Sequence, residues 1–247
     1  MEKTLVKKKM KWIIILFIIV VLTSAFLIYT ENYYHAESSA LEELKTDKTV
    51  SVTQTDYGWL FDGPSERDIL IFYPGAKVEE TAYAPLLHHL AEQGMDVCLV
   101  KMPFRFAVFG ADKAEHVMEM YDYAHWYIGG HSLGGAIAAN YAAEHTVQLT
   151  GVILLAAYPT KVIDDSLILI SIYGSEDGVL NMTRMAEGEQ YVPGNSTQYV
   201  IEGGNHARFG NYGEQKGDGK ASISAEEQQR RTVELISQCI SNENTDN

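Results

Sequence analysis

Short, uninterrupted apolar runs alternate with segments of helical spacing over most of this chain, and this alternation restricts the fold more than any other feature. The runs have strand length and end at glycine or proline; in order they read DILIFYP, MDVCLVKMP, AHWYIGG, GVILLAAYP and LILISIYG. Segments such as YAPLLHHLAEQG and LGGAIAANYAAEH lie between them. Strands that are apolar throughout are buried on both faces, so we predict an α/β fold with a mostly parallel central sheet and helices on both faces.

The boundaries of this domain follow from the outermost predicted elements. Two short strands, VSVTQT and GWLF, come first; TQYVIEGG is the last strand, and SAEEQQRRTVELISQCI is a closing helix. Ser224 and Glu227 have the spacing of a capping box at the start of that helix. We therefore predict a domain over residues 51–242, followed by a short tail, 243–247.

The first thirty residues differ in composition from the rest. Five lysines lie within residues 1–11, and an uncharged apolar run follows from Trp12 to Thr30. At 1.5 Å per residue this run spans about 28 Å, close to the thickness of a membrane's hydrocarbon core. We predict a basic cytoplasmic tail (1–11), a single transmembrane anchor (12–30) and a polar stalk (31–50), with the domain outside the cell. A cleaved signal peptide, which would make the domain a secreted protein, is the alternative.

Charge and cysteine content exclude several classes of function. The formal net charge is −14, which argues against a general nucleic-acid-binding protein, because phosphate neutralisation needs clustered lysine and arginine. Cys98 and Cys239 lack the paired spacing of a zinc site, and we expect two buried free thiols rather than a disulfide. The sequence predicts neither a cofactor nor a metal site.

Ser132 lies at the centre of the segment GGHSLGG, at the junction between an apolar strand and an alanine-rich helix. A nucleophile on such a sharp turn is held in a strained backbone conformation, and side chains at Gly130 and Gly134 would collide with the neighbouring strand and helix. We expect the ring of His131 to point away from the serine. The first N–H groups of the helix face any negative charge that develops beside Ser132. Ser132 is therefore the candidate nucleophile.

A nucleophilic serine needs a base and an orienting carboxylate, which follow in the chain in the order serine, acid, histidine. Of the eight histidines, only His206 follows a late strand, in IEGGNHARFG. Asp177 follows the run LILISIYG and has a shorter side chain than Glu176. Asp164 and Asp165, after the preceding strand, are the alternative acids. We expect the glycine-rich segment after His206 to support it.

Two backbone N–H groups are candidates for an oxyanion hole. One belongs to Leu133, directly after the serine, and the other to Ala76, in the loop FYPGAKVEE after the first long strand. Gly75 allows the backbone to approach the substrate there. Three aromatic side chains in MPFRFAVFG either line an acyl pocket or belong to the core: Phe104, Phe106 and Phe109.

These residues together resemble the α/β-hydrolase superfamily, and in particular its small bacterial members related to dienelactone hydrolase. The resemblance covers about residues 57–241 and rests on FYPGAKVEE, GGHSLGGA, YGSEDG and IEGGNHARFG. It implies a catalytic triad of Ser132, Asp177 and His206. Pro74-Gly75 stands where the family usually has His-Gly. Because the dienelactone enzymes use a cysteine nucleophile, their substrate is not expected here.

The predicted function is therefore that of a membrane-anchored serine hydrolase, a carboxylesterase that acts on a small ester or acyl substrate through an acyl-enzyme. The connection TKVIDD is too short for a large lid, which favours short-chain or surface-bound esters. A catalytically inactive binding module on a hydrolase scaffold is one alternative. A serine peptidase or an acyltransferase is another.

Overall fold

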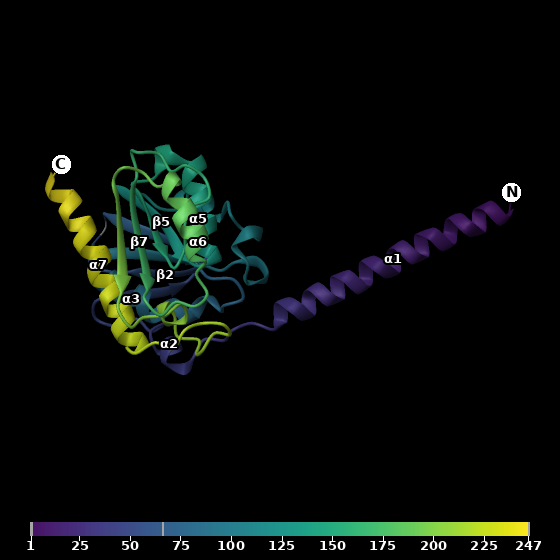
Figure 1. Cartoon of the computed structure of the whole chain (residues 1–247), viewed down its shortest axis with the longest axis horizontal. Coiled ribbons are helices and arrows are strands. Elements are labelled where there is room, and N and C mark those ends of the chain that lie inside the picture. The colour runs from purple at the N-terminus through teal and green to yellow at the C-terminus, as the bar shows by residue number, and fades with distance from the viewer. Residues whose placement is uncertain (1, 66, 247) are drawn as a thin grey trace. The chain divides into compact units, whose positions relative to one another are not determined.

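The computed structural model describes residues 2–65 and 67–246, and the chain divides between Tyr33 and Tyr34 into two compact units. The first unit contains the helix α1 (Glu2–Glu31; Figure 1). Within it, Lys9–Glu31 is long and apolar enough to cross a membrane, with 23 residues and a mean hydropathy of 2.8. Its apolar side chains are exposed, unlike those of a core helix; Phe17 is 68% exposed and Ile28 is 73% exposed. The helix is thus a candidate membrane span. Residue 1 of the expected basic tail lies outside the described residues.

The second unit is built on an eight-stranded sheet with the strand order β1-β2-β4-β3-β5-β6-β7-β8. β1 and β2 pair antiparallel at one edge, and β3 to β8 run parallel, so the predicted mostly parallel sheet is confirmed. The strands are β1 Ser51–Gln54, β2 Gly58–Asp62, β3 Asp68–Tyr73, β4 Met95–Val100, β5 His125–His131, β6 Gly151–Leu155, β7 Ile168–Gly174 and β8 Ser196–Ile201.

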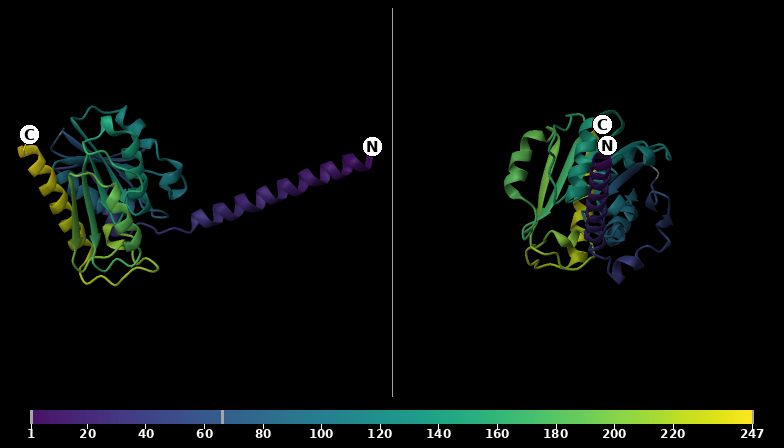
Figure 2. Two further views of the ribbon diagram at one scale, coloured as in Figure 1. Left: turned by 45° about the horizontal axis from the view of Figure 1, so that its top comes forward. Right: turned by 90° about the vertical axis from the view of Figure 1, so that its right-hand side faces the viewer.

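Helices cover both faces of this sheet, as predicted. The α-helices of the unit are α2 Ser38–Glu42, α3 Ala84–Glu92, α4 Lys113–Met118, α5 Leu133–Glu144, α6 Met182–Gly188 and α7 Ala225–Asp246. One apolar cluster joins a face of the sheet to α3 and α7, and a second joins the other face to α4 and α5. Figures 1 and 2 show α7 (yellow) on one side of the sheet and α5 (teal) on the other. Burial of the apolar strands on both faces holds the layers together.

Parallel strands bring their carboxyl ends to one edge of the sheet. β3 ends at Tyr73, β5 at His131, β7 at Gly174 and β8 at Ile201. Four loops that are far apart in the sequence therefore meet at this edge, and they carry the residues predicted for the active site.

The stalk predicted over residues 31–50 is wrong for residues 34–50, which are part of the folded unit. The Tyr34 N–H donates to the carbonyl oxygen of Lys77 (2.7 Å), and the Glu79 N–H donates to the carbonyl oxygen of Tyr34 (2.9 Å). Ala40 and Val50 are buried. The segment is polar in composition, but a few buried apolar side chains and backbone hydrogen bonds are enough to attach it. The domain therefore begins at Tyr34 rather than at residue 51.

The folded unit also extends further than predicted at its carboxyl end. α7 continues to Asp246, so residues 243–246 of the predicted tail are helical, and residue 247 lies outside the described residues. The Glu227 N–H donates to Ser224 Oγ (3.1 Å), which is one half of the predicted capping box. Cys98 and Cys239 are both free; Cys98 is buried, whereas Cys239 is half-buried.

Candidate active site

Ser132 lies on the sharp turn between β5 and α5. Its φ of 54° and ψ of −125° place it in a left-handed region that residues with side chains seldom occupy. The turn is held from both sides: the Ser132 N–H donates to the carbonyl oxygen of Leu155 on β6 (2.9 Å), and the Ala136 N–H donates to the carbonyl oxygen of Ser132 (3.0 Å). The strained conformation is thus maintained by the sheet and by the first turn of the helix.

The glycines on either side of Ser132 are required by close backbone contacts. A Cβ at Gly130 would collide with the carbonyl oxygen of Tyr73 at the end of β3. A Cβ at Gly134 would collide with the carbonyl oxygens of Tyr73 and Pro74. The helix α5 can therefore pack against the end of β3 only where side chains are absent, which agrees with the collisions predicted from the sequence.

His206 and Asp177 come together from two different loops. His206 Nδ1 lies 2.8 Å from Asp177 Oδ2, and the two side chains are only 2% and 1% exposed. The other oxygen, Asp177 Oδ1, accepts the N–H groups of Val179 (2.8 Å) and Leu180 (2.7 Å). Because the carboxylate accepts the Nδ1 proton, Nε2 of the neutral ring is left with a lone pair. Nε2 is buried and has no hydrogen-bond partner among the described residues.

Asp218 ties the acid loop to the histidine loop, a role that the sequence did not single out. Its Oδ1 accepts the N–H groups of Gly178 (3.1 Å) and His206 (3.2 Å), and its Oδ2 accepts the Ala207 N–H (2.8 Å). The glycine-rich segment after His206 therefore supports it, as expected. Nothing in the local sequence distinguishes Asp218 from an exposed loop residue.

The ring of His131 lies beside the histidine of the site, a contact that the sequence did not predict. The ring centroids of His131 and His206 are 4.5 Å apart. Its Nδ1 is 2.8 Å from the hydroxyl of Tyr83, which also accepts the Gly75 N–H (3.1 Å). Burial and the neighbouring His206 hold the pKa of His131 well below its ordinary value, so the ring is neutral. The chain from Gly75 through Tyr83 to His131 joins the loop after β3 to the ring of His206.

The two N–H groups predicted for an oxyanion hole lie in the loops after β3 and β5. Leu133 is the first residue of α5, so its N–H has no partner within the helix. Ala76 lies between Gly75, which hydrogen-bonds to Tyr83, and Lys77, whose N–H donates to the carbonyl oxygen of Arg105 (2.9 Å). Among the described residues no acceptor is bonded to the Ala76 N–H. Leu133 borders a cavity beside Ser132, whereas Ala76 does not.

Ser132 and His206 border one cavity of about 420 Å³. This volume falls within the usual range of small-molecule sites. Its remaining walls are mostly apolar and are formed by Leu133, Ala136, Ile137, Asn140, Ala156, Ala157, Tyr158, Thr160, Val179, Leu180 and Asn181. The connection between β6 and β7, residues 156–167, contains no helix and forms no large lid over the cavity.

The sequence model of the Alpha/beta hydrolase family matches residues 69–230, about two thirds of the chain. This chain belongs to the alpha/beta hydrolase family. The match includes the serine turn, the Asp177 loop and the His206 loop. The relation to dienelactone hydrolase stays a prediction. No curated protein matches the sequence.

Solved alpha/beta hydrolase structures share the fold at low sequence identity. Est1E from Butyrivibrio proteoclasticus is 14% identical (TM-score 0.55) and matches 78% of this chain and 100% of its own. A monoglyceride lipase from Saccharomyces cerevisiae is 12% identical (TM-score 0.55) and matches 78% and 96%. A membrane phospholipase A, described as a bacterial virulence factor, is 11% identical (TM-score 0.57) and matches 97% and 99%.

The three phenylalanines predicted to form an acyl pocket or core do neither. Phe104 and Phe109 are 46% and 52% exposed, and none of the three borders the cavity beside Ser132. They contact one another edge to face, with centroid separations of 5.8 Å for Phe104–Phe109 and 6.3 Å for Phe106–Phe109. The segment turns through two short 3-10 helices on the surface, which the apolar composition alone did not indicate.

Proposed function

We propose that this alpha/beta hydrolase is a serine esterase that cleaves carboxylic esters through an acyl-enzyme. The observation that carries the proposal is the state of His206. Its Nδ1 is held by the buried carboxylate of Asp177, and its unpartnered Nε2 belongs to a ring that borders the same cavity as Ser132. A buried imidazole with a fixed tautomer and a free lone pair is equipped to accept the proton of a nucleophile.

The proposed reaction uses each of these residues in turn. His206 Nε2 takes the proton of Ser132 Oγ as the oxygen attacks the ester carbonyl, and the Ala76 and Leu133 N–H groups stabilise the resulting oxyanion. Asp177 keeps the second proton on Nδ1 and stabilises the imidazolium that forms. His206 then protonates the leaving alcohol. In the second half of the reaction, His206 takes a proton from water as the water attacks the acyl-enzyme, and it then returns that proton to Ser132 Oγ as the acid is released.

The cavity supports a short or medium acyl group as the substrate. Its walls are mostly apolar, its volume is about 420 Å³, and the β6–β7 connection leaves it without a large lid. Structural neighbours with the same fold include esterases and lipases by name, which favours ester over amide chemistry. Acyl transfer to an alcohol would require that water be excluded from the site.

We also propose that α1 anchors the enzyme in the cell membrane, with its amino end in the cytoplasm and the catalytic unit outside. The lysines before the apolar run and the length of that run support this orientation. The intact mass of the membrane-bound protein tests whether the amino-terminal segment is retained. A mature chain that begins after residue 31 would instead indicate a cleaved signal peptide.

The catalytic proposal is tested with the full chain in detergent micelles. We expect labelling by a fluorophosphonate probe and hydrolysis of p-nitrophenyl esters, with a maximum at short acyl chains. Ser132→Ala should abolish both, whereas Ser166→Ala, at an exposed serine after β6, should change neither. A folded parent protein that neither labels nor turns over would favour the binding module. Turnover of amides alone would favour a peptidase.

A further inference from the structure

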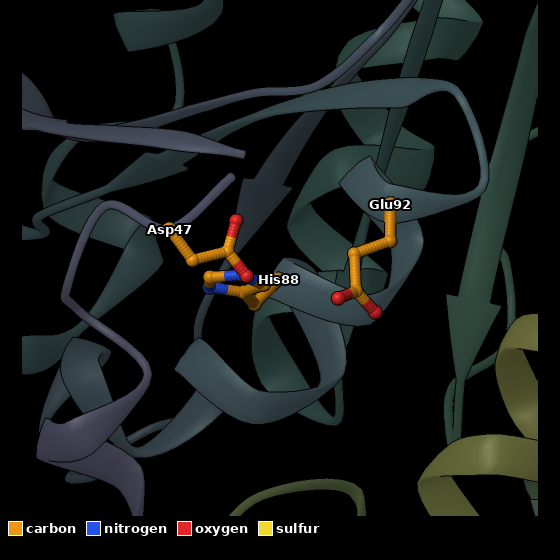
Figure 3. A group of neighbouring side chains, drawn as sticks. All are labelled: Asp47, His88 and Glu92. Carbon is orange, nitrogen blue, oxygen red and sulfur yellow. The ribbon is translucent and has the colours of Figure 1, made fainter. Parts of the chain in front are cut away.

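A second group of polar side chains lies on α3 and on the segment before β1. It consists of Asp47, His88 and Glu92, each of which offers a ligand atom within 4.8 Å of the others (Figure 3). His88 and Glu92 are one turn apart on α3 (Ala84–Glu92), and Asp47 reaches them from the connection between α2 and β1. We propose that these three residues bind a divalent transition-metal ion, with zinc as the favoured ion.

The ring of His88 is held so that one nitrogen faces the carboxylate of Asp47. The side chain is buried, with 4% of the residue exposed, and its Nδ1 lies 2.9 Å from the backbone carbonyl oxygen of Glu43. A carbonyl oxygen only accepts hydrogen bonds, so Nδ1 is the donor in this pair and Nε2 is the ring atom left for a ligand. Nε2 faces Asp47 Oδ2 at 3.5 Å. A buried imidazole nitrogen and an exposed carboxylate oxygen at this separation can both be ligands of one cation.

The separation of these two atoms fits one edge of a tetrahedral site. With metal–ligand bonds of about 2.0–2.1 Å, two ligands of tetrahedral zinc lie about 3.3–3.4 Å apart. The observed 3.5 Å between His88 Nε2 and Asp47 Oδ2 is close to this value. Glu92 completes the set by a movement of about 1.5 Å or less, estimated from the 4.8 Å limit and the tetrahedral edge. Its side chain is one-third exposed, so it has room to turn.

Each of the three ligands is oriented by a partner outside the set, as in established metal sites. Asp47 Oδ1 accepts the N–H groups of Thr49 (2.7 Å) and Val50 (2.8 Å), which leaves Oδ2 directed at His88. The ring of His88 is fixed by the carbonyl of Glu43. Glu92 Oε2 lies 2.9 Å from Nδ1 of the neighbouring His89, which holds that carboxylate beside the helix. Asp47 and His88 are therefore arranged before any ion binds, and Glu92 is the ligand that must turn from His89 to the ion.

The ligand types select the class of ion. Two carboxylates balance the charge of a divalent cation, and an imidazole ligand favours zinc, copper, iron or nickel over magnesium and calcium, which prefer oxygen. Three protein ligands leave one tetrahedral position for water. The residues bridge segment 34–50 to α3, so the bound ion would fasten the start of the domain to the sheet layer. This role is structural and does not depend on the proposed esterase activity.

The test uses the untagged full chain in detergent micelles after treatment with EDTA. Zinc added in calorimetry should bind at one site per chain, and saturating zinc should raise the melting temperature by about 5–10 °C at 100-fold excess over Kd. Asp47→Asn and Glu92→Gln each alter a partly exposed ligand and should weaken zinc binding by at least 10-fold. Ester turnover by the parent chain should be the same with and without zinc, which separates this result from the fate of the catalytic proposal.

A matched control comes from another histidine–carboxylate pair. His116 is exposed and its Nε2 lies 3.9 Å from Asp56 Oδ2; no third ligand is grouped with this pair in the described part of the chain. His116→Gln should leave the zinc affinity unchanged. The proposal is overturned if the parent does not bind zinc at 0.1 mM, or if Asp47→Asn and Glu92→Gln bind it as the parent does.

Discussion

Asp177→Asn offers the sharpest test of the proposed catalytic group, because the structure determines how the new amide must orient. Asp177 uses both of its oxygens: Oδ1 accepts the N–H groups of Val179 and Leu180, and Oδ2 accepts the proton on His206 Nδ1. Asparagine has nearly the same shape but only one oxygen. Its NH2 group must therefore face either the two backbone N–H groups or the imidazole.

The energies of the two orientations differ greatly. If the NH2 group faces Val179 and Leu180, both backbone N–H groups lose their acceptor, at about 1–3 kcal/mol each, or about 2–6 kcal/mol together. The amide oxygen therefore stays on the backbone N–H groups, and the NH2 group donates to His206 Nδ1. The imidazole proton then moves to Nε2, which can no longer accept the proton of Ser132. We expect kcat to fall by about 10⁴-fold, the loss that this substitution causes in the serine-protease triad.

The assay is ester hydrolysis at saturating substrate, together with a thermal melt to verify the fold. Asp164→Asn is the matched control, because Asp164 is exposed and accepts only the Ser166 N–H (2.9 Å) from its backbone neighbours; its activity should remain at the parent level. Activity of Asp177→Asn within 10-fold of the parent, or a large loss in Asp164→Asn, would refute the assignment of Asp177.

Three further predictions concern the residues around Ser132. Gly134→Ala places a methyl group against two backbone carbonyl oxygens. We therefore expect the free energy of unfolding in urea to fall by about 1–3 kcal/mol and probe labelling to be lost. A variant that is as stable as the parent and is labelled would contradict the packing argument. Tyr83→Phe leaves the Gly75 N–H and His131 Nδ1 without their shared partner. The free energy of unfolding should therefore fall by about 1–3 kcal/mol, and kcat should fall by a larger factor than KM rises. An unchanged unfolding free energy and unchanged kcat would show that the hydroxyl orients neither loop. His131 has a depressed pKa when folded, so the unfolded chain binds more protons below pH 6.5, and stability should decrease as the pH falls through that value by at most about 1.4 kcal/mol per pH unit. His131→Gln should remove that part of the slope; an unchanged slope would mean that His131 is charged in the folded protein.

Several features were predictable because they depend on neighbours in the sequence or on chain order. The apolar strands could be recognised from their length and their glycine and proline ends. The turn at Ser132 could be recognised from the glycines that its backbone requires. Asp177 and His206 were selected because each follows a late strand, and in the structure their side chains lie 2.8 Å apart.

Other features depend on contacts between distant parts of the chain. The ring of His131 was expected to point away from the serine, but the sequence did not show what it contacts; its partner is Tyr83, which is 48 residues away. The stalk prediction failed because segment 34–50 pairs with the loop after β3, and its composition carries no sign of that pairing. The prediction for the three phenylalanines failed because an apolar segment does not by itself show whether another part of the chain covers it; Phe104 and Phe109 are exposed.

The sequence alone thus determined the order and type of the elements and the strained serine turn, because hydrophobic periodicity and backbone sterics act over a few residues. The tertiary structure decided which side chains meet: Asp218 with the histidine loop, Tyr83 with His131, and Asp47 with His88 and Glu92. Each of these contacts joins polar groups on separate loops or helices. Their partners are chosen by burial and by hydrogen-bond geometry, which exist only after the chain has folded.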